Sequence, residues 1–141
     1  MKQKTINKNE LVIDGTNATL GRLASYAAKQ TLLGKNIVIV NSNEVVVVGT
    51  KEVIMNKYMD LVKKGGSSLK GPKIARNPER IVKRTIRGMV PHKQYRGSEA
   101  IRRVMCYNET PEEYKDVKKI RAGKEKRGKF TTLKQLVNLI K

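Results

Sequence analysis

The residues best suited to chemistry are basic side chains in the segment 78–88. Four of them are spaced i, i+3, i+4 and i+7: Arg80, Lys83, Arg84 and Arg87. This spacing places them on one face of a helix. Guanidinium and ammonium groups bind phosphate, and the planar fork of arginine can donate two parallel hydrogen bonds to it. A solvated basic face usually has acids four residues away, and only Glu79 is available here, so the pattern favours phosphate contact.

Further basic residues lie on both sides of this segment. Between residues 63 and 103 there are 13 Lys and Arg against two acids, counted from the sequence, within a chain of 141 residues and net charge +19. The predicted set of phosphate-contacting residues consists of the following: Lys70, Lys73, Arg76, Arg80, Lys83, Arg84, Arg87, Gly88, His92, Lys93, Arg96, Arg102 and Arg103. The glycines at 65, 66, 71, 88 and 97 suit close approach of a sugar–phosphate chain, and they equally suit plain turns.

The charge balance restricts the class of partner. A domain with a charge of +19 repels itself, so a polyanionic partner is expected, with nucleic acid favoured over an anionic membrane surface. No apolar run approaches the ~18 residues of a membrane span, and no apolar leader segment follows Lys2 and Lys4. The single cysteine, Cys106, excludes an intramolecular disulfide and a zinc site of several thiolates.

The kind of nucleic acid can also be argued. Aromatic residues make up only 4% of the chain and there is no Trp, which disfavours a platform that stacks unpaired bases. The sequence contains no pattern of a zinc finger, helix-turn-helix or basic zipper. Recognition of the backbone shape of a folded RNA therefore fits best, and a DNA-compacting protein is the alternative among nucleic-acid binders.

Enzymatic interpretations have weaker support. The spacing of Gly15 and Gly21 is not the G-x-G-x-x-G of dinucleotide-binding turns, although a nucleotide-using enzyme with a Rossmann-like core remains an alternative. We interpret Asp14 as a turn residue, because no second titratable partner is near it in the sequence. His92 is expected to bind phosphate or face solvent, and Cys106 to be a small core residue.

The elements that must position the basic face follow from apolar periodicity. We expect strands at 11–13, 37–40, 45–48 and 104–107 and helices at 20–33, 51–62, 78–88, 98–103 and 132–140. Strand, helix and strand in that order form a right-handed βαβ unit with parallel strands. Since the link 41–44 is too short for a parallel crossover, the strand at 45–48 is expected antiparallel to its predecessor or at an edge. After residue 108 the chain is expected to be irregular apart from the last helix.

Two long motifs carry a resemblance to a known family. Residues 13–25, IDGTNATLGRLAS, and residues 84–93, RTIRGMVPHK, resemble the two signatures of the large-subunit ribosomal protein family numbered thirteen. Arg96-Gly97, Ala100 and the strand at 104–107 continue the similarity, which covers roughly residues 11–107 in order. The segment 51–62 and the Pro-His-Lys run resemble the archaeal and eukaryotic branch of that family.

This resemblance implies a fold and a function. The expected fold is a three-layer α/β/α single domain over residues 1–141, with a mostly parallel four-stranded sheet and a basic helical extension. Its core is expected at about 10–108, followed by an irregular basic C-terminal tail at 109–141. The implied role is structural: binding of 23S-type ribosomal RNA in the large subunit, in support of assembly and translation. Implied partners are that RNA and neighbouring large-subunit proteins, in cytoplasmic ribosomes. The resemblance implies no catalysis, cofactor, metal, small-molecule substrate or membrane.

Overall fold

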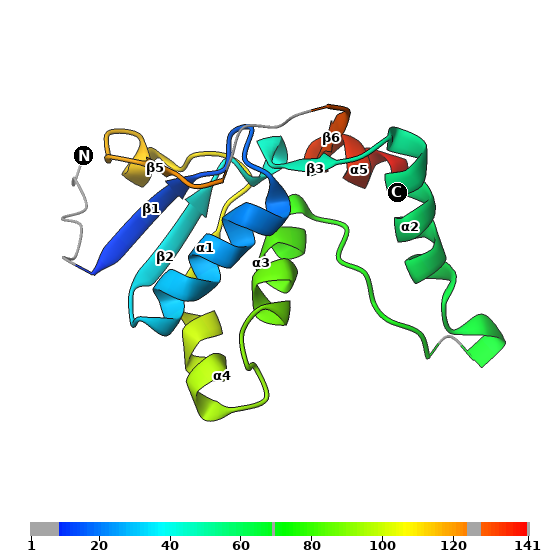
Figure 1. The fold of residues 1–141 in the computed structure, drawn as a ribbon, viewed down its shortest axis with the longest axis horizontal. Coiled ribbons are helices and arrows are strands. Elements are labelled where there is room, and N and C mark those ends of the chain that lie inside the picture. The colour runs from blue at the N-terminus through cyan, green and yellow to red at the C-terminus, as the bar shows by residue number, and fades with distance from the viewer. Residues whose placement is uncertain (1–8, 69, 124–127, 141) are drawn as a thin grey trace.

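The core of the protein is a parallel sheet with strand order β4-β2-β1-β5 (Figure 1). The computed structural model describes residues 9–68, 70–123 and 128–140. The strands are β1 (Glu10–Asp14), β2 (Asn36–Val40), β4 (Val104–Cys106) and β5 (Ile120–Arg121). Continuous β-branched runs at β1 and β2 suit strands covered on both faces. The predicted α/β class with a mostly parallel four-stranded sheet is confirmed.

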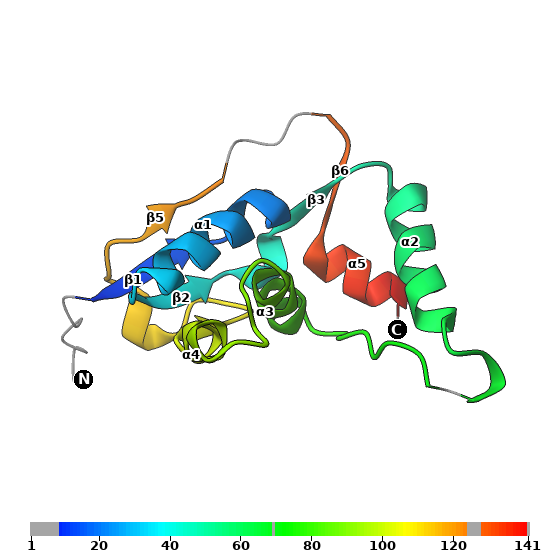
Figure 2. The same cartoon turned by 60° about the horizontal axis from the view of Figure 1, so that its bottom comes forward.

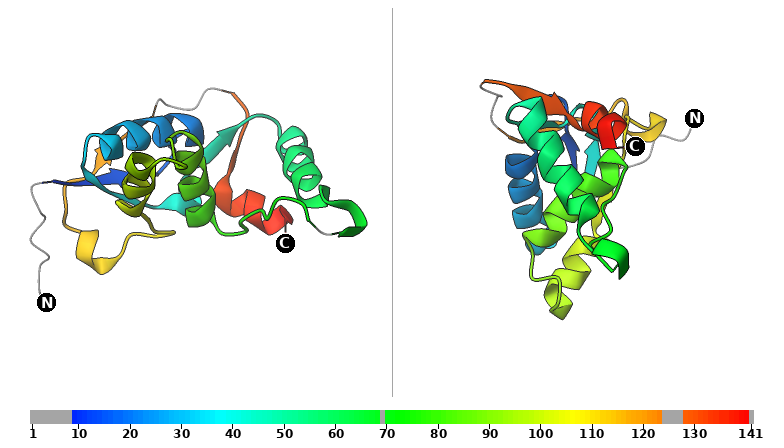
Figure 3. Two further views of the ribbon diagram at one scale, coloured as in Figure 1. Left: turned by 90° about the horizontal axis from the view of Figure 1, so that it is seen from below. Right: turned by 90° about the vertical axis from the view of Figure 1, so that its right-hand side faces the viewer.

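Three helices cover one face of this sheet (Figures 1 and 3). They are α1 (Leu20–Leu32), α3 (Pro78–Gly88) and α4 (Tyr95–Arg102), and α1 packs on both others. The small residues Ala24 and Ala27 on the buried side of α1 permit close packing within the main core. The predicted bounds of α1 and α3 agree with the structure to within one residue, whereas α4 begins three residues before the expected position.

The opposite face of the sheet has a smaller apolar cluster. Val12, Val38 and Val40 are buried there against Tyr114, which belongs to the 3-10 turn η3 (Glu112–Tyr114). The Tyr114 hydroxyl donates a hydrogen bond to Glu10 Oε1 at 3.0 Å, which fastens this cover to β1. The second covering layer is therefore made by the segment after β4 rather than by a long helix.

The third apolar run does not join the main sheet, so the expectation for it is wrong. Asn41 adopts a left-handed conformation (φ 57°) and is followed by the 3-10 turn η1 (Ser42–Glu44), which redirects the chain. The strand β3 (Val46–Val48) then pairs antiparallel with β6 (Phe130–Thr132) in a separate two-stranded sheet. β3 thus pairs with β6, more than 80 residues further along the chain, and not with β2, which the short link 41–44 had suggested.

The remaining helices form a lobe beside the main sheet (Figure 2). The helix α2 (Lys51–Lys63) packs on α5 (Leu133–Ile140) and on β6. The α2–α3 connection, residues 64–77 with the 3-10 turn η2 (Gly66–Ser68), leads back to the sheet. The segment after residue 108 is thus irregular over much of its described length, but it contributes β5, β6 and the predicted last helix. Four side chains of that helix are buried in the main core: Leu133, Leu136, Val137 and Ile140.

Candidate nucleic-acid interface

The helix α3 has one buried and one basic face, as its periodicity predicts. Ile81, Val82 and Ile86 on the sheet side are at most 5% exposed. The helix begins at Pro78, a position where a backbone N–H would have no partner within the helix, so proline costs no hydrogen bond there. The backbone N–H of Glu79 donates a hydrogen bond to Asn108 Oδ1 at 3.1 Å. Apolar burial and a fixed start hold the orientation of the helix, so its opposite face presents the cations in a defined arrangement.

An open groove lies along the basic face of α3. It has a volume of about 510 Å³. Its lining consists of Lys73, Arg80, Lys83, Arg84, Arg87 and Ile101. We call it the cationic groove. None of these lining residues is acidic, so the groove has five positive charges without a counter-charge in its wall. Such a concave positive surface attracts a polyanion and can neutralise several phosphates at once.

Arg84 links the cationic groove to the α2–α3 connection. Its Nη1 donates a hydrogen bond to the backbone carbonyl of Lys73 at 2.5 Å. This bond holds the end of the connection against α3 and brings the exposed Lys73 side chain into the groove. Lys70 and Arg76, which are also predicted contacts, are exposed on the same connection. The end of this connection therefore has a fixed attachment to the basic helix.

The turn after α3 is built around a close backbone approach. A Cβ at Gly97 would overlap the carbonyl of Pro91, so only glycine fits there. Gly71 meets the carbonyl of Lys64 in the same way, and both glycines are therefore explained by contacts within the chain. Gly88 differs, since a Cβ there would meet nothing within 4 Å. Of the two interpretations of these glycines, turn chemistry accounts for positions 71 and 97.

The predicted contacts after α3 fall into two groups. Lys93 and Arg96 are exposed, and His92 is half-buried with its backbone N–H bonded to Val90 O at 2.7 Å. Arg102 pairs with Glu99 at 2.9 Å, and Arg103 is half-buried with its Nη1 3.4 Å from the carbonyl of Thr31 near the end of α1. A cation is favourable at that helix end. Arg102 and Arg103 therefore also have partners within the protein.

Hydrogen bonds within the protein hold the first strand-to-helix turn, which follows β1. The Asp14 carboxylate accepts hydrogen bonds from the backbone N–H of Thr16 (3.0 Å), the Thr16 hydroxyl (2.7 Å) and Asn41 Nδ2 (3.0 Å). Burial raises the pKa of Asp14, but the bonds from Asn41 and Thr16 outweigh it and hold the pKa below its usual value. A Cβ at Gly15 would lie 2.8 Å from the Val45 side chain. These contacts confirm the interpretation of Asp14 as a turn residue.

Other chemistry finds little support in the described part of the chain. Burial raises the pKa of the Cys106 thiol to about 12, and its side chain packs against the main core, as expected. Among the described residues, no three His, Cys, Asp or Glu side chains are grouped so that they can hold a metal ion. No helix in the described ranges is long and apolar enough to span a bilayer.

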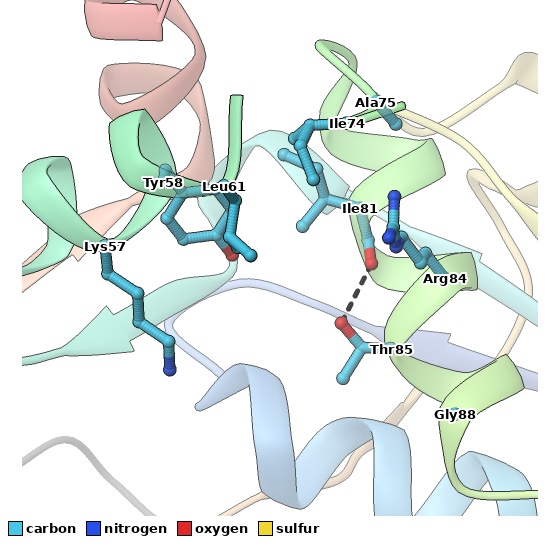
Figure 4. Close-up of a pocket in the computed structure, with 9 residues that line it drawn as sticks. All are labelled: Lys57, Tyr58, Leu61, Ile74, Ala75, Ile81, Arg84, Thr85 and Gly88. Carbon is cyan, nitrogen blue, oxygen red and sulfur yellow. Dashed lines mark hydrogen bonds between the residues drawn. The ribbon is translucent and has the colours of Figure 1, made fainter. Parts of the chain in front are cut away.

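One basic residue near the site was not predicted. Lys57 on α2 lines a second cavity, of about 250 Å³, whose other wall is α3 with Arg84 (Figure 4). The sequence gives no signal for Lys57, because α2 carries mixed charges and its position opposite α3 depends on the tertiary fold. The two cavities share Arg84 in their linings.

Comparison with known proteins agrees with the two motifs. The sequence profile of a family described as "Ribosomal protein L13" matches residues 8–113. A relative from Archaeoglobus fulgidus, named "Large ribosomal subunit protein uL13", is 44% identical over 110 residues, which are 78% of this chain and 70% of the relative. Relatives of the same name from Picrophilus torridus (38% identity, 92% of this chain, 96% of the relative) and Caenorhabditis elegans (36%, 83% and 59%) also match. The chain belongs to the ribosomal protein L13 family. The expected family, of archaeal and eukaryotic type, is thereby confirmed.

The part that matches the ribosomal protein L13 profile contains all thirteen predicted contacts. It includes α1 to α4 and the strands β1 to β4, and it ends within η3. The later elements β5, β6 and α5 lie beyond it, although β6 and α5 pack on α2.

Proposed function

We propose that this ribosomal protein L13 family member is a non-catalytic structural protein of the large ribosomal subunit. In this proposal it binds large-subunit ribosomal RNA through the cationic groove. The observation that carries the proposal is the groove itself, in which five cations meet without an acid. Four of them lie on α3, whose opposite face is buried in the core, and the fifth, Lys73, lies on the α2–α3 connection. The large ribosomal subunit as the place where this surface acts is supported by the relatives that are named large ribosomal subunit protein.

The groove suits the backbone of a folded RNA. Arginine at three of its five basic positions can take phosphate oxygens in pairs, which fixes the orientation of the strand as well as attracting it. Release of condensed counterions then supplies much of the affinity. The exposed cations of the α2–α3 connection, of the turn before α4 and of the first turn of α4 extend this contact: Lys70, Arg76, Lys93 and Arg96. The protein thereby holds neighbouring RNA segments together during assembly, beside neighbouring large-subunit proteins.

A salt titration tests this proposal directly. The affinity of the purified protein for deproteinised large-subunit rRNA is measured by filter binding over a series of KCl concentrations. The logarithm of the affinity should fall steeply with the logarithm of salt, by about 0.7–0.9 per neutralised phosphate if the values known for DNA are a guide. A nearly flat salt dependence would refute binding through the cationic groove.

Two controls separate the alternatives. A DNA-compacting protein would bind duplex DNA as well as rRNA in competition at physiological salt, whereas an rRNA-binding protein should prefer rRNA. A nucleotide-using enzyme would be stabilised against heat by mononucleotides, and we expect no shift. In cell extract the protein should sediment with large subunits and be released by a high-salt wash; sedimentation away from ribosomes would contradict the proposal.

A further inference from the structure

The cavity beside the cationic groove has the composition of a site for a ring with a phosphate. One wall is α2 with Tyr58 and Leu61, and the other is α3 together with Ile74 near the end of the connection (Figure 4). The lining is largely apolar, with two cations, Lys57 and Arg84, and no acid. Mostly apolar walls with a few placed polar groups are typical of ligand sites.

The size of the cavity limits what it can receive. Its volume of about 250 Å³ is several times the ~30 Å³ share of one water molecule, yet lies below the roughly 300–1,000 Å³ of pockets for drug-sized ligands. A single ring system falls between these limits. The sides of Leu61, Ile74 and Ile81 offer apolar contact to the flat face of such a ring.

The cavity adjoins the proposed RNA-binding surface. Arg84 lines both the cavity and the cationic groove, and its bond to the carbonyl of Lys73 holds it between them. A strand whose phosphate lies at Arg84 therefore has the groove on one side and the apolar cavity on the other. Lys57 adds a second charge from the α2 side.

We propose that the cavity between α2 and α3 receives one unpaired nucleobase of the bound RNA, whose phosphate lies at Arg84, while Lys57 adds a positive charge at the opposite wall. The proposal rests on the proposed function and names a nucleotide subsite within it. An apolar side chain of a partner protein would leave both cations without a counter-charge, whereas a nucleotide supplies the ring and the charge together. This charge complementarity decides between the two occupants.

Tyr58 adds a polar group to this subsite. Burial raises the pKa of its phenol, and the positive charge of Arg84 only partly opposes this, so the hydroxyl keeps its proton at neutral pH. The hydroxyl has no hydrogen-bond partner among the described residues, and the Tyr58 side chain lines the cavity. The hydroxyl can therefore donate to an acceptor on the edge of the base.

The test fills the cavity without removing a charge. Gly88→Leu places a side chain at its edge, where a Cβ meets nothing within 4 Å and the backbone is helical, and Ala75→Leu narrows it from the connection. Gly21→Leu is the matched control, because Gly21 is an exposed helical glycine of α1 with equally open space. The probe is deproteinised large-subunit rRNA, and melting curves establish that each variant is folded.

Both filling variants should lose affinity by at least about fivefold, which corresponds to about 1 kcal/mol of lost contact with the base. The slope of affinity against salt should stay that of the parent, since no cation is lost. Gly21→Leu should bind like the parent. If both filled and folded variants bind within twofold of the parent, the nucleobase site is refuted while RNA binding by the groove stands. If the unmodified protein itself showed no salt-dependent binding to rRNA, the proposed function would be refuted instead.

Ultraviolet crosslinking of the unmodified protein to the same rRNA gives an independent measurement. Crosslinks mapped by mass spectrometry should include residues 57–61 of α2 in addition to residues of α3. Crosslinks on α3 without any on residues 57–61 would overturn the inference, and this reading does not depend on any variant folding.

Discussion

Ile86 and Arg87 are adjacent residues that should have opposite effects when replaced by alanine. Ile86 is 0% exposed within the main core, and Arg87 lines the cationic groove. Ile86→Ala removes buried apolar atoms and leaves a cavity, which typically costs about 2–5 kcal/mol. Because the whole stability of such a domain is about 5–15 kcal/mol, this is a large fraction of it. At roughly 3–4 °C per kcal/mol, the melting midpoint should fall by about 10 °C.

Arg87→Ala should leave the fold intact and change RNA binding. Arg87 is exposed, and its side chain makes no hydrogen bond to the described part of the protein. Its replacement is therefore expected to change the free energy of unfolding by no more than about 0.5 kcal/mol. Loss of one phosphate contact should reduce the steepness of the log–log salt dependence by about 0.7–0.9. Arg87 is preferred to Arg84 for this experiment, because Arg84 also bonds to the carbonyl of Lys73 and its loss would disturb the connection.

The assay combines circular-dichroism melting with filter binding over a KCl series. Ile86→Ala should show the shifted midpoint and, below it, the salt slope of the parent. Arg87→Ala should show the midpoint of the parent and the reduced slope. The opposite pattern, with Arg87→Ala unfolding and Ile86→Ala harmless, would refute the assignment of the two faces of α3.

Three further predictions concern single positions. Gly97→Ala should cost about 1–3 kcal/mol of stability and so lower the melting midpoint, because its Cβ would overlap the Pro91 carbonyl. Gly88→Ala should be neutral or slightly stabilising, because a Cβ there meets nothing within 4 Å. Equal effects of the two substitutions on the midpoint would contradict the turn geometry. The lowered pKa of Asp14 means that its carboxylate stabilises the fold above the ordinary value of 3.8 and that this contribution is lost as the pH falls through the lowered pKa. Asp14→Asn should therefore flatten the acid limb of a denaturation curve measured against pH, and an unchanged limb would exclude this role. Since the pKa of Cys106 is about 12, iodoacetamide at pH 8 should alkylate it only after unfolding, as followed by mass spectrometry, and rapid reaction of the native protein would show an exposed thiol.

The helices of the main body could be predicted because their signals are local. The bounds of α3 follow from Asn77-Pro78 at one end and Gly88 at the other, and its two faces follow from its periodicity alone. The position of β3 could not be predicted in this way. The left-handed Asn41 and the turn η1 direct the chain away from β2, and the pairing partner of β3 lies near the other end of the sequence.

The candidate site shows the same division. Charge counting and helical spacing identified the five basic residues of the cationic groove, because four of them lie on one helix, but not Ile101. They did not identify Lys57, Tyr58 or Leu61, since these face α3 only through the tertiary fold. The glycines show the limit of composition as evidence: Gly97 and Gly88 look alike in the sequence, yet only Gly97 is required by a contact within the chain.

The last helix has a part in the site although none of its residues is a predicted contact. The helix α2 supplies one wall of the cavity, and it packs on α5 and on β6. The backbone N–H of Leu133 donates to the Val45 carbonyl at 2.8 Å, which joins the start of α5 to the chain just before β3, and Leu136 is fully buried behind it. These elements lie beyond residue 113, where the match to the ribosomal protein L13 profile ends, and α5 packs on α3 as well as on α2. The proposed nucleotide site therefore depends on the last helix, which supports one of its two walls, as well as on the basic helix.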